Sequence, residues 1–291
     1  MPPLFPFLLP AIDLIMEGTT GVLYLVSTPI GNLEDITLRA LRILKEVDLV
    51  ACEDTRRSKK LLSHYGISKP LISYYSPKEA QRVPLLLDRL KKGENVALIT
   101  DAGTPLLSDP GWRLVKEAIE EGVPLVPVPG PSALLAALVA SGFPTCPFAF
   151  WGFPPRKKGK LLHFLKGIKG MGLTHVFFES PKRILGTLKI MEEVWGDRRV
   201  VVAREMTKAY EEFIRGRLRE VRASLEARKE VKGEVVLLVE GREGKPWKDK
   251  ALGLAEEGFG AKEVAKILKV LYGTSKKEVY SLLERRNLDS G

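Results

Sequence analysis

Cysteine, histidine and side-chain amides are scarce in this 291-residue chain, and their scarcity excludes several kinds of site. The chain has two cysteines and three histidines. Two cysteines cannot build a disulfide scaffold and favour a reducing compartment, so we predict a cytoplasmic protein. None of these five residues stands at a metal-binding spacing, so we predict no metal site. One Gln and three Asn, beside 46 Lys and Arg, are typical of a thermophilic source.

Long hydrophobic runs are also missing. No apolar run reaches the roughly 18–20 residues that a membrane helix needs. The first sixteen residues are apolar, but prolines at positions 2, 3, 6 and 10 interrupt them, and they lack the basic start of a secretory signal. We therefore expect residues 1–15 to be a leader outside the fold, with folded sequence beginning near Met16.

The usual nucleotide and nucleophile motifs are absent as well. There is no Gly-x-x-x-x-Gly-Lys-Ser/Thr phosphate loop, and no Gly-x-Gly-x-x-Gly follows a predicted strand. No Gly-x-Ser-x-Gly nucleophile elbow exists either. These absences argue against kinase and dehydrogenase chemistry and against an α/β-hydrolase nucleophile.

Short apolar strands alternating with helices are what the sequence does contain. In the first half we predict strands at 21–27, 47–51, 71–74, 95–100 and 124–128, separated by helices. This alternation is typical of a parallel α/β sheet. A second α/β set follows, with strands at 149–152, 174–179, 199–203 and 234–240. The sequence therefore predicts an α/β protein.

Two breaks in this pattern indicate the domain limits. Prolines crowd residues 126–132, and a polar stretch at 241–250 interrupts the alternation before a tail of short helices. We predict a leader at 1–15, an N-terminal α/β domain at 16–128, a C-terminal α/β domain at 129–241, and a linker with a small helical module at 242–291.

Polar turns follow four strands of the first half, at 27–35, 53–57, 100–105 and 129–133. Ligands of open α/β sheets bind at the carboxyl ends of the strands. Gly103 and Gly130 permit close backbone approach, and Asp101 can balance a cationic ligand. Asp, Ser, Thr, Gly and Pro are also what ordinary turns need. Four such turns at one edge favour a site for a small polar ligand.

The second half adds charged strand ends and a basic stretch. Arg204 and Glu205 follow the apolar residues 200–203 directly, where solvation is less complete. No acidic residue lies between Trp151 and Phe178, and aromatic residues are interleaved there with basic ones. This mixture suits an RNA backbone with stacked bases, although it also fits an ordinary basic helix face. The candidate RNA-binding residues are Arg156, Lys157, Lys158 and Lys160.

Taken in order, these motifs resemble the 16S ribosomal RNA (cytidine-2′-O)-methyltransferase family of the tetrapyrrole methylase superfamily, the class III methyltransferases. The resemblance implies two α/β domains with the cofactor cleft between them, S-adenosylmethionine as the methyl donor, and a homodimer. It also implies 16S rRNA or the small ribosomal subunit as partner, with the ribose 2′-hydroxyl of a decoding-region cytidine as acceptor. The segments that carry it are 27–32, 53–56, 101–105, 129–133, 179–183 and 203–208.

The resemblance also implies which residues line the donor pocket. These are Ile30, Asp101, Ala102, Gly103, Thr104, Ser132, Ala133 and Phe178. The sequence departs from the family at Lys182, where the family typically has histidine, so a role that needs an imidazole is not carried over. The first loop lacks the Gly-x-Gly-x-Gly-Asp of the tetrapyrrole-modifying relatives, which favours the rRNA branch.

Catalysis of such a transfer requires alignment of the methyl group and removal of the hydroxyl proton. The candidate bases are Glu53, Asp54 and Glu205. The candidate cations, for a flanking phosphate or the developing oxyanion, are Lys182, Arg183, Arg204 and Lys208. The sequence does not choose among them.

Two other functions fit parts of the sequence. A tetrapyrrole or small-molecule methyltransferase would keep the fold, but the basic stretch at 156–169 and the missing glycine motif argue against it. A non-enzymatic nucleic-acid-binding protein would use the helical tail. That tail is nearly balanced, with 11 basic and 8 acidic residues between Arg242 and Gly291.

Overall fold

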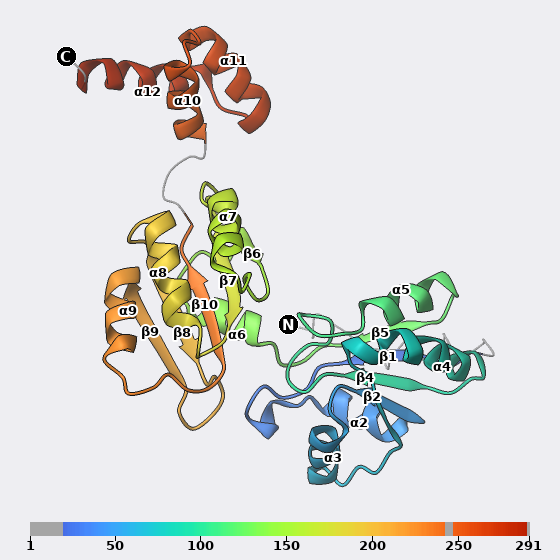
Figure 1. Cartoon of the computed structure of the whole chain (residues 1–291). Helices are drawn as coiled ribbons and strands as arrows, with labels where there is room; N and C mark the ends of the chain where they lie inside the picture. The colour runs from blue at the N-terminus through green and yellow to red at the C-terminus, as the bar shows by residue number, and fades with distance from the viewer. Residues whose placement is uncertain (1–19, 242–246, 290–291) are drawn as a thin grey trace, which may run out of the picture. The chain divides into compact units, whose positions relative to one another are not determined.

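The computed structural model describes residues 20–241 and 247–289 (Figure 1). The predicted leader at 1–15 lies outside the described residues. The contacts divide the chain into two compact units. The first ends at Ala140 and also includes Ala203–Glu212; the second comprises Ser141–Val202 and the chain from Phe213 onward. No described helix is long and apolar enough to cross a membrane.

The first unit is a five-stranded sheet with helices on both faces (Figure 1). Its strand order is β3-β2-β4-β1-β5, and each neighbouring pair runs parallel. The strands are β1 (Leu23–Val26), β2 (Leu49–Cys52), β3 (Leu71–Ser73), β4 (Val96–Ile99) and β5 (Leu125–Val128). The helices are η1 (Leu33–Asp35), α2 (Leu38–Glu46), α3 (Thr55–His64), η2 (Ser76–Lys78), α4 (Glu79–Lys91), α5 (Trp112–Glu120) and α6 (Ala133–Ala140).

Alternating side chains of β1 explain the layers. Tyr24 and Val26 pack in one core with Ile43 of α2. Leu23 faces the opposite way and packs in a second core with Leu86 of α4. Successive side chains of a strand point to opposite faces, so a strand apolar throughout is buried between two helical layers. The predicted parallel α/β sheet is confirmed for this unit.

The second unit contains a mixed five-stranded sheet of order β6-β7-β10-β8-β9. Strand β6 is parallel to β7, whereas β10 is antiparallel to β7. The strands are β6 (Phe148–Phe150), β7 (Thr174–Glu179), β8 (Arg199–Arg204), β9 (Glu212–Arg217) and β10 (Val235–Val239). The helices α7 (Lys158–Ile168), α8 (Ile184–Trp195) and α9 (Leu218–Glu226) share one core with the sheet through Leu165, Leu188 and Leu225.

Three further helices end the chain and form a core of their own. They are α10 (Trp247–Glu256), α11 (Ala261–Tyr272) and α12 (Lys276–Asp289). Trp247, Leu268 and Val279, one from each helix, pack together. We predicted that the polar stretch at 241–250 interrupts the regular structure. This prediction is wrong from Trp247 onward, because α10 begins there. That indole and Ala251 anchor the helix despite the polar residues between them.

The division by contacts differs from the predicted boundary after Val128. Helix α6 groups with the first unit, as does Ala203–Glu212 between β8 and β9. Sequence reasoning missed β9 because Glu212–Arg217 is mostly half-buried and its apolar run is only two residues long, Phe213 and Ile214. The predicted limits 16–128, 129–241 and 242–291 stay a prediction about folding domains.

Candidate functional site

The four polar turns of the first unit meet at the carboxyl edge of its sheet, as predicted. We call this edge the carboxyl rim; it comprises residues 27–35, 53–57, 100–111 and 129–133. Thr28 and Gly103 exchange two backbone hydrogen bonds of 2.9 Å. Ser27 Oγ donates to Thr104 Oγ1 at 3.3 Å, and Thr104 Oγ1 donates to the carbonyl of Pro131 at 3.1 Å. The turns after β1, β4 and β5 are therefore joined.

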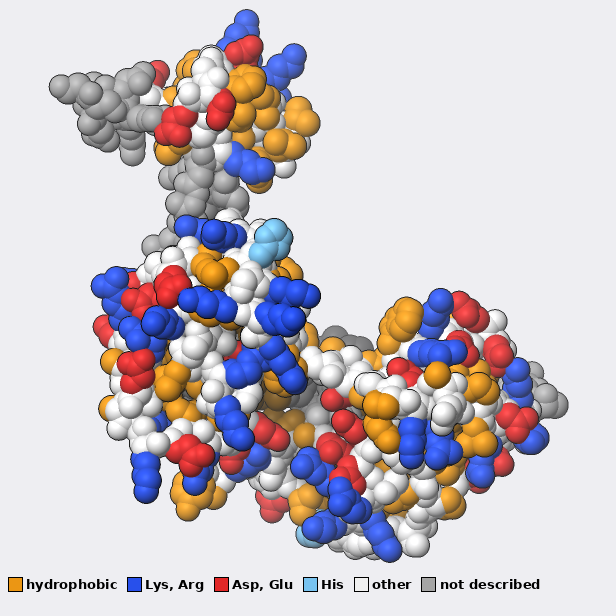
Figure 2. Space-filling view, viewed as in Figure 1, with side chains coloured by type: hydrophobic (Ala, Val, Ile, Leu, Met, Phe, Trp, Pro, Cys, Tyr) orange, Lys and Arg blue, Asp and Glu red, His pale blue; other side chains and the backbone are white. Residues whose placement is uncertain are grey.

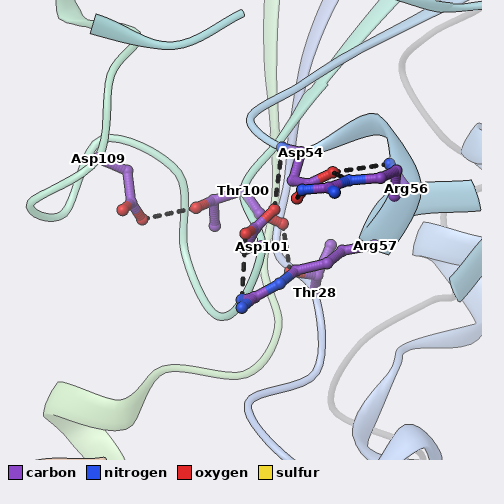
Figure 3. A network of polar contacts seen from close by, with 7 residues as sticks. All are labelled: Thr28, Asp54, Arg56, Arg57, Thr100, Asp101 and Asp109. Carbon is purple, nitrogen blue, oxygen red and sulfur yellow. Dashed lines mark hydrogen bonds and ion pairs between the residues drawn. The ribbon is translucent and has the colours of Figure 1, made fainter. Parts of the chain in front are cut away.

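Asp101 ties the turn after β2 to the same rim (Figure 3). Its Oδ1 accepts a hydrogen bond of 3.1 Å from the backbone N–H of Asp54. Its Oδ2 lies 3.2 Å from Nη1 of Arg57. Both carboxylate oxygens of Asp101 therefore have partners within the rim, which fixes the side chain at the centre of the four turns.

Asp109 is a rim carboxylate that the sequence-based candidate set did not include. Its Oδ2 accepts a hydrogen bond of 2.7 Å from Oγ1 of Thr100, whose carbonyl accepts one of 3.0 Å from Thr28 (Figure 3). Burial raises the pKa of Asp109, and the charge of Asp101 raises it further. The turn containing Asp109 continues directly from residues 100–105, so its position in that polar stretch was the available signal.

The two adjacent candidate bases of the rim have opposite electrostatics. Burial raises the pKa of Glu53, and the charges of Asp101 and Asp109 add to this effect. Hydrogen bonds from the side chain and backbone of Arg56 lower the pKa of Asp54 to about 2. A carboxylate with a raised pKa is the stronger proton acceptor. Asp54 instead caps helix α3, since its Oδ1 accepts from the backbone N–H of Arg56.

The segment Ala203–Glu212 brings two more candidates to the first unit. The backbone N–H of Asn32 donates to Oγ1 of Thr207 at 3.0 Å. Lys208 Nζ lies 2.8 Å from Oε1 of Glu205, in an ion pair. Gly31 has no room for a side chain, because a Cβ there would lie 2.5 Å from Cγ of Lys208. Glu205 and Lys208 are thus placed against the turn after β1.

The backbone of this segment is unusual at two positions. Glu205 has φ +50° and Thr207 has φ +65°. A positive φ is a genuine outlier for a β-branched residue such as Thr207, and such strain clusters at functional sites. The backbone N–H of Thr207 is held by Glu211 Oε2 at 2.7 Å. Arg204, at the end of β8, forms an ion pair of 3.2 Å with Glu212.

Seven of the eight predicted donor-binding residues lie at the rim. Ile30 is buried, and its Cγ2 lies 3.4 Å from where a Cβ of Gly103 would be. Gly103 itself has φ +85°, which favours glycine. The backbone carbonyl of Ser132 accepts a hydrogen bond from the backbone N–H of Ala136, at the start of helix α6. The residues at the rim are Ile30, Asp101, Ala102, Gly103, Thr104, Ser132 and Ala133.

Phe178, the eighth predicted donor-binding residue, belongs to β7 of the second unit. It is half-buried, and its ring packs edge-to-face on Phe150 at 4.8 Å and on Phe153 at 5.7 Å between centroids. The three rings form an aromatic surface at which Phe153 is 57% exposed.

The two candidate cations after β7 have different surroundings. Lys182 is exposed. Arg183 donates from Nη2 to the carbonyls of Pro154 and Pro155 at 3.0 and 3.3 Å, and the same nitrogen lies 3.4 Å from the buried Glu179. Its guanidinium therefore holds the loop that leads into the basic stretch.

The predicted RNA-binding residues Arg156, Lys157, Lys158 and Lys160 are all exposed, around the start of α7. Figure 2 shows Lys and Arg side chains gathered over this part of the surface. The first turn of α7 contains no acidic residue, and Lys157 makes no capping hydrogen bond through its side chain. Cations at a helix N-terminus oppose the helix dipole and do not stabilise the helix. Their presence here is more consistent with an anionic partner.

The rim suits the cationic donor implied by the sequence. Glu53, Asp101 and Asp109 place carboxylates together; burial is the main cause of the raised pKa values of Glu53 and Asp109, and the neighbouring negative charges raise them further. A sulfonium cation would relieve that repulsion. Among the described residues, no group of three or more His, Cys, Asp or Glu is placed to hold a metal ion.

Comparison with known proteins agrees with this geometry. The sequence profile of the Tetrapyrrole (Corrin/Porphyrin) Methylases matches residues 22–222. The "Ribosomal RNA small subunit methyltransferase I" of Haemophilus influenzae is 45% identical over 274 residues, which cover 91% of this chain and 97% of that protein. The protein of the same name from Thermotoga maritima is 48% identical over 223 residues, covering 77% of this chain and 100% of that protein.

Solved structures share the fold at lower identity. Diphthine synthase superimposes with a TM-score of 0.61 at 17% identity, covering 76% of this chain and 90% of that one. Uroporphyrin-III C-methyl transferase from Thermus thermophilus, complexed with S-adenyl homocysteine, gives a TM-score of 0.55 at 23% identity, covering 76% and 97%. The predicted fold class and enzyme class are confirmed. With this sheet, this rim and these relatives, the chain belongs to the ribosomal RNA small subunit methyltransferase I family of the tetrapyrrole methylases, as a methyltransferase that uses S-adenosylmethionine.

Proposed function

We propose that this enzyme methylates the ribose 2′-hydroxyl of a decoding-region cytidine in 16S rRNA, either in the free RNA or in the small subunit. The observation that carries the proposal is the 45% identity, over nearly the whole chain, to a ribosomal RNA small subunit methyltransferase I. The exposed basic stretch at Arg156–Lys160 supports an RNA substrate. A ribosomal substrate places the activity in the cytoplasm.

The donor is proposed to bind at the carboxyl rim. When bound, S-adenosylmethionine supplies an activated methyl group on a sulfonium. The carboxylates of Glu53, Asp101 and Asp109 balance that positive charge electrostatically. The turns of Asp101–Thr104 and Ser132–Ala133 offer backbone groups to its polar parts, with Ile30 as an apolar wall. Phe178, in the second unit, stays a donor-binding residue that only the family resemblance implies.

Glu53 is the base that we propose among the three candidates. The ribose hydroxyl is a poor nucleophile until its proton leaves. Asp54 is a weak acceptor, because Arg56 holds its pKa at about 2. Glu205 is paired with Lys208. Glu53 has a raised pKa, is half-buried, and lies in the turn after β2 that Asp101 fixes.

The candidate cations divide into two proposed roles. Lys208, although paired with Glu205, lies against the turn after β1, where its ammonium would stabilise a developing oxyanion or hold a phosphate alongside that pair. Lys182 is exposed and free to reach an RNA phosphate. Arg183 and Arg204 are positioning residues in this proposal, since each is engaged with protein groups through Pro154 and Glu212 respectively.

A homodimer is also proposed, through helix α6. Its eight residues are Ala, Leu and Val only, and a helix that is apolar all round is normally buried. Leu135 and Val139 nevertheless lie 53% and 73% exposed, four residues apart on one face. A second copy of the chain would cover this face.

Size measurement by light scattering tests the dimer. Leu135→Lys with Val139→Lys is expected to give a folded monomer, because two charges would be buried at the interface. Leu38→Lys on α2 is the control, since Leu38 is 86% exposed outside this face. A double variant with the same mass as the wild type would contradict the proposed interface.

The substrate class is tested with labelled S-adenosylmethionine. We expect transfer to 16S rRNA or to the small subunit and none to a porphyrinoid. Transfer to the porphyrinoid alone would make the enzyme a tetrapyrrole methyltransferase.

A further inference from the structure

A pocket of about 280 Å³ opens in the first unit between the carboxyl rim and helix α3. Of its lining residues, only Asp101 belongs to the predicted site. Pro29 and Gly31 come from the turn after β1, and Leu61 comes from α3. The full lining is Pro29, Gly31, Leu33, Arg57, Ser58, Lys60, Leu61, Thr100 and Asp101.

The charged residues that line this pocket are two cations and one acid. Arg57 and Lys60 are three residues apart on α3, so they lie on the same helix face. The one acid, Asp101, already accepts from the backbone of Asp54 and pairs with Arg57. That pairing uses Nη1 of Arg57 and leaves its other guanidinium nitrogens for a ligand. The pocket therefore offers positive charge above an apolar floor.

Helix α3 does not need these cations for its own stability. Its first turn contains Arg56 and Arg57 and no acidic residue, although cations are unfavourable at that end of a helix dipole. Lys60 is exposed, and within the described part of the chain it forms no ion pair. Arg56, in contrast, is committed to Asp54. Arg57 is partly accounted for by its pair with Asp101, whereas the charge of Lys60 has no ion-pair partner among the described residues and is available to an anion in the pocket.

The pocket adjoins the proposed reaction centre. Gly31 lines it and also contacts Lys208 and Thr207 of the segment Ala203–Glu212. Asp101 lines it and raises the pKa of Glu53 through its charge. An anion held by Arg57 and Lys60 would thus lie close to the groups proposed to handle the acceptor hydroxyl.

We propose that this pocket binds a backbone phosphodiester of the single-stranded RNA next to the acceptor ribose, with Arg57 and Lys60 as its ligands. This inference rests on the proposed function and adds the residues that seat the acceptor strand. Apolar contacts from Pro29, Leu33 and Leu61 suit the sugar that the phosphate carries. Holding the adjacent phosphate fixes the ribose in line with the methyl group.

The test compares two lysines of the same helix. Lys60 lines the pocket, whereas its neighbour Lys59 is equally exposed and does not. The probe is a labelled synthetic RNA of the decoding region, and its affinity for the full-length enzyme is measured across a range of salt concentrations. Each phosphate contact contributes about 0.7 to the slope of log K against log salt for single strands.

We expect Lys60→Gln to lower RNA affinity roughly three- to tenfold at low salt and to reduce the slope by about 0.7. Lys60→Arg should restore both, and Lys59→Gln should leave the slope as in the wild type. The affinity for S-adenosylmethionine, measured by calorimetry, should not change in any variant. Equal effects of Lys59→Gln and Lys60→Gln, no effect of either, or weaker donor binding by Lys60→Gln would each overturn the proposal.

The same series separates this inference from the proposed function. If the wild type binds the RNA but methylates no rRNA, the proposed function is contradicted. The salt slopes of the Lys60 and Lys59 variants then still decide whether the pocket binds a phosphate. A wild type that methylates rRNA while Lys60→Gln binds normally would contradict the pocket alone.

Discussion

At the level of single residues, neighbouring carboxylates of the rim differ in pKa because their surroundings differ. Glu53 and Asp54 are neighbours in sequence, yet burial and the charges of Asp101 and Asp109 raise the pKa of the first, while Arg56 lowers that of the second to about 2. The same residue class therefore provides a candidate base and a helix cap. This contrast leads to the first prediction.

The rate of methyl transfer should fall on acidification through the raised pKa of Glu53. A raised pKa keeps the carboxyl protonated up to a higher pH than an ordinary glutamate, so the basic form is lost earlier as pH falls. Glu53→Gln is expected to lower kcat by about 10²–10⁴-fold and to remove this acid limb. The pH profile of kcat measures both, with Asp54→Asn as the variant that keeps the limb. A fully active Glu53→Gln would rule out its role as base.

His175 predicts a second pH effect, on stability. It is fully buried among Trp151, Phe177 and Trp195, and burial lowers its pKa to about 4 from 6.5. Between these two values the unfolded chain binds more protons, so the stabilisation present above pH 6.5 is lost as pH falls towards 4. Urea unfolding should show a loss of about 2 kcal/mol from this residue between pH 7.5 and 5.

His175→Gln serves as its comparison, because an amide can accept the hydrogen bond that the indole of Trp151 donates to Nδ1 of His175 at 3.1 Å. The variant should lose stability less steeply over the same pH range, whatever its stability at pH 7.5. An unchanged pH dependence would show that His175 is not the titrating group.

At the element scale, the segment Ala203–Glu212 fixes the turn after β1. Thr207 holds Asn32 with a hydrogen bond, and the side chain of Lys208 occupies the space where Gly31 lacks a Cβ. These contacts join residues 175 positions apart in the sequence. They set the position of Lys208 and Glu205, so the third prediction concerns Thr207.

Thr207→Val should lower kcat about tenfold, the equivalent of one lost hydrogen bond, while Thr207→Ser should stay close to the wild type. Valine keeps the shape and the strained φ but removes the hydroxyl that accepts from Asn32. Thermal melting checks that both variants fold alike. If valine and serine behaved equally in steady-state kinetics, the hydroxyl would have no positioning role.

Some elements of the fold could be predicted from the sequence and others could not. The parallel sheet and the meeting of its four turns followed from buried apolar strands with polar carboxyl ends, such as β4 with Asp101. Strand β9 was missed because it is only half-buried and three of its six residues are charged, which leaves a two-residue apolar run. Long-range contacts group Ala203–Glu212 with the first unit and bind the guanidinium of Arg183 to the carbonyl of Pro154. No local pattern of residues encodes such contacts.

In the whole molecule, the C-terminal helices form a hydrophobic core of their own. Their core contains only residues from Trp247 onward, whereas the cores of the two sheets contain residues from Val22 to Val239. The three helices therefore have a hydrophobic core separate from those of the two sheets.

Removal of residues 242–291 should accordingly leave a folded enzyme with an unchanged kcat. Circular dichroism would establish the fold, and methyl transfer to rRNA the rate. A truncated protein that keeps its sheets but transfers no methyl group would contradict this separation.

Nucleotide-resolution mass mapping would show directly whether the enzyme methylates a ribose in 16S rRNA. Unmodified 16S rRNA, free and in small subunits, would be incubated with the enzyme and isotopically labelled S-adenosylmethionine, then digested and sequenced by mass spectrometry. We expect one labelled methyl group on the ribose of a single decoding-region cytidine, and strongly reduced labelling with Glu53→Gln. A label on a base, on a different ribose, or on no ribosomal nucleotide would contradict it.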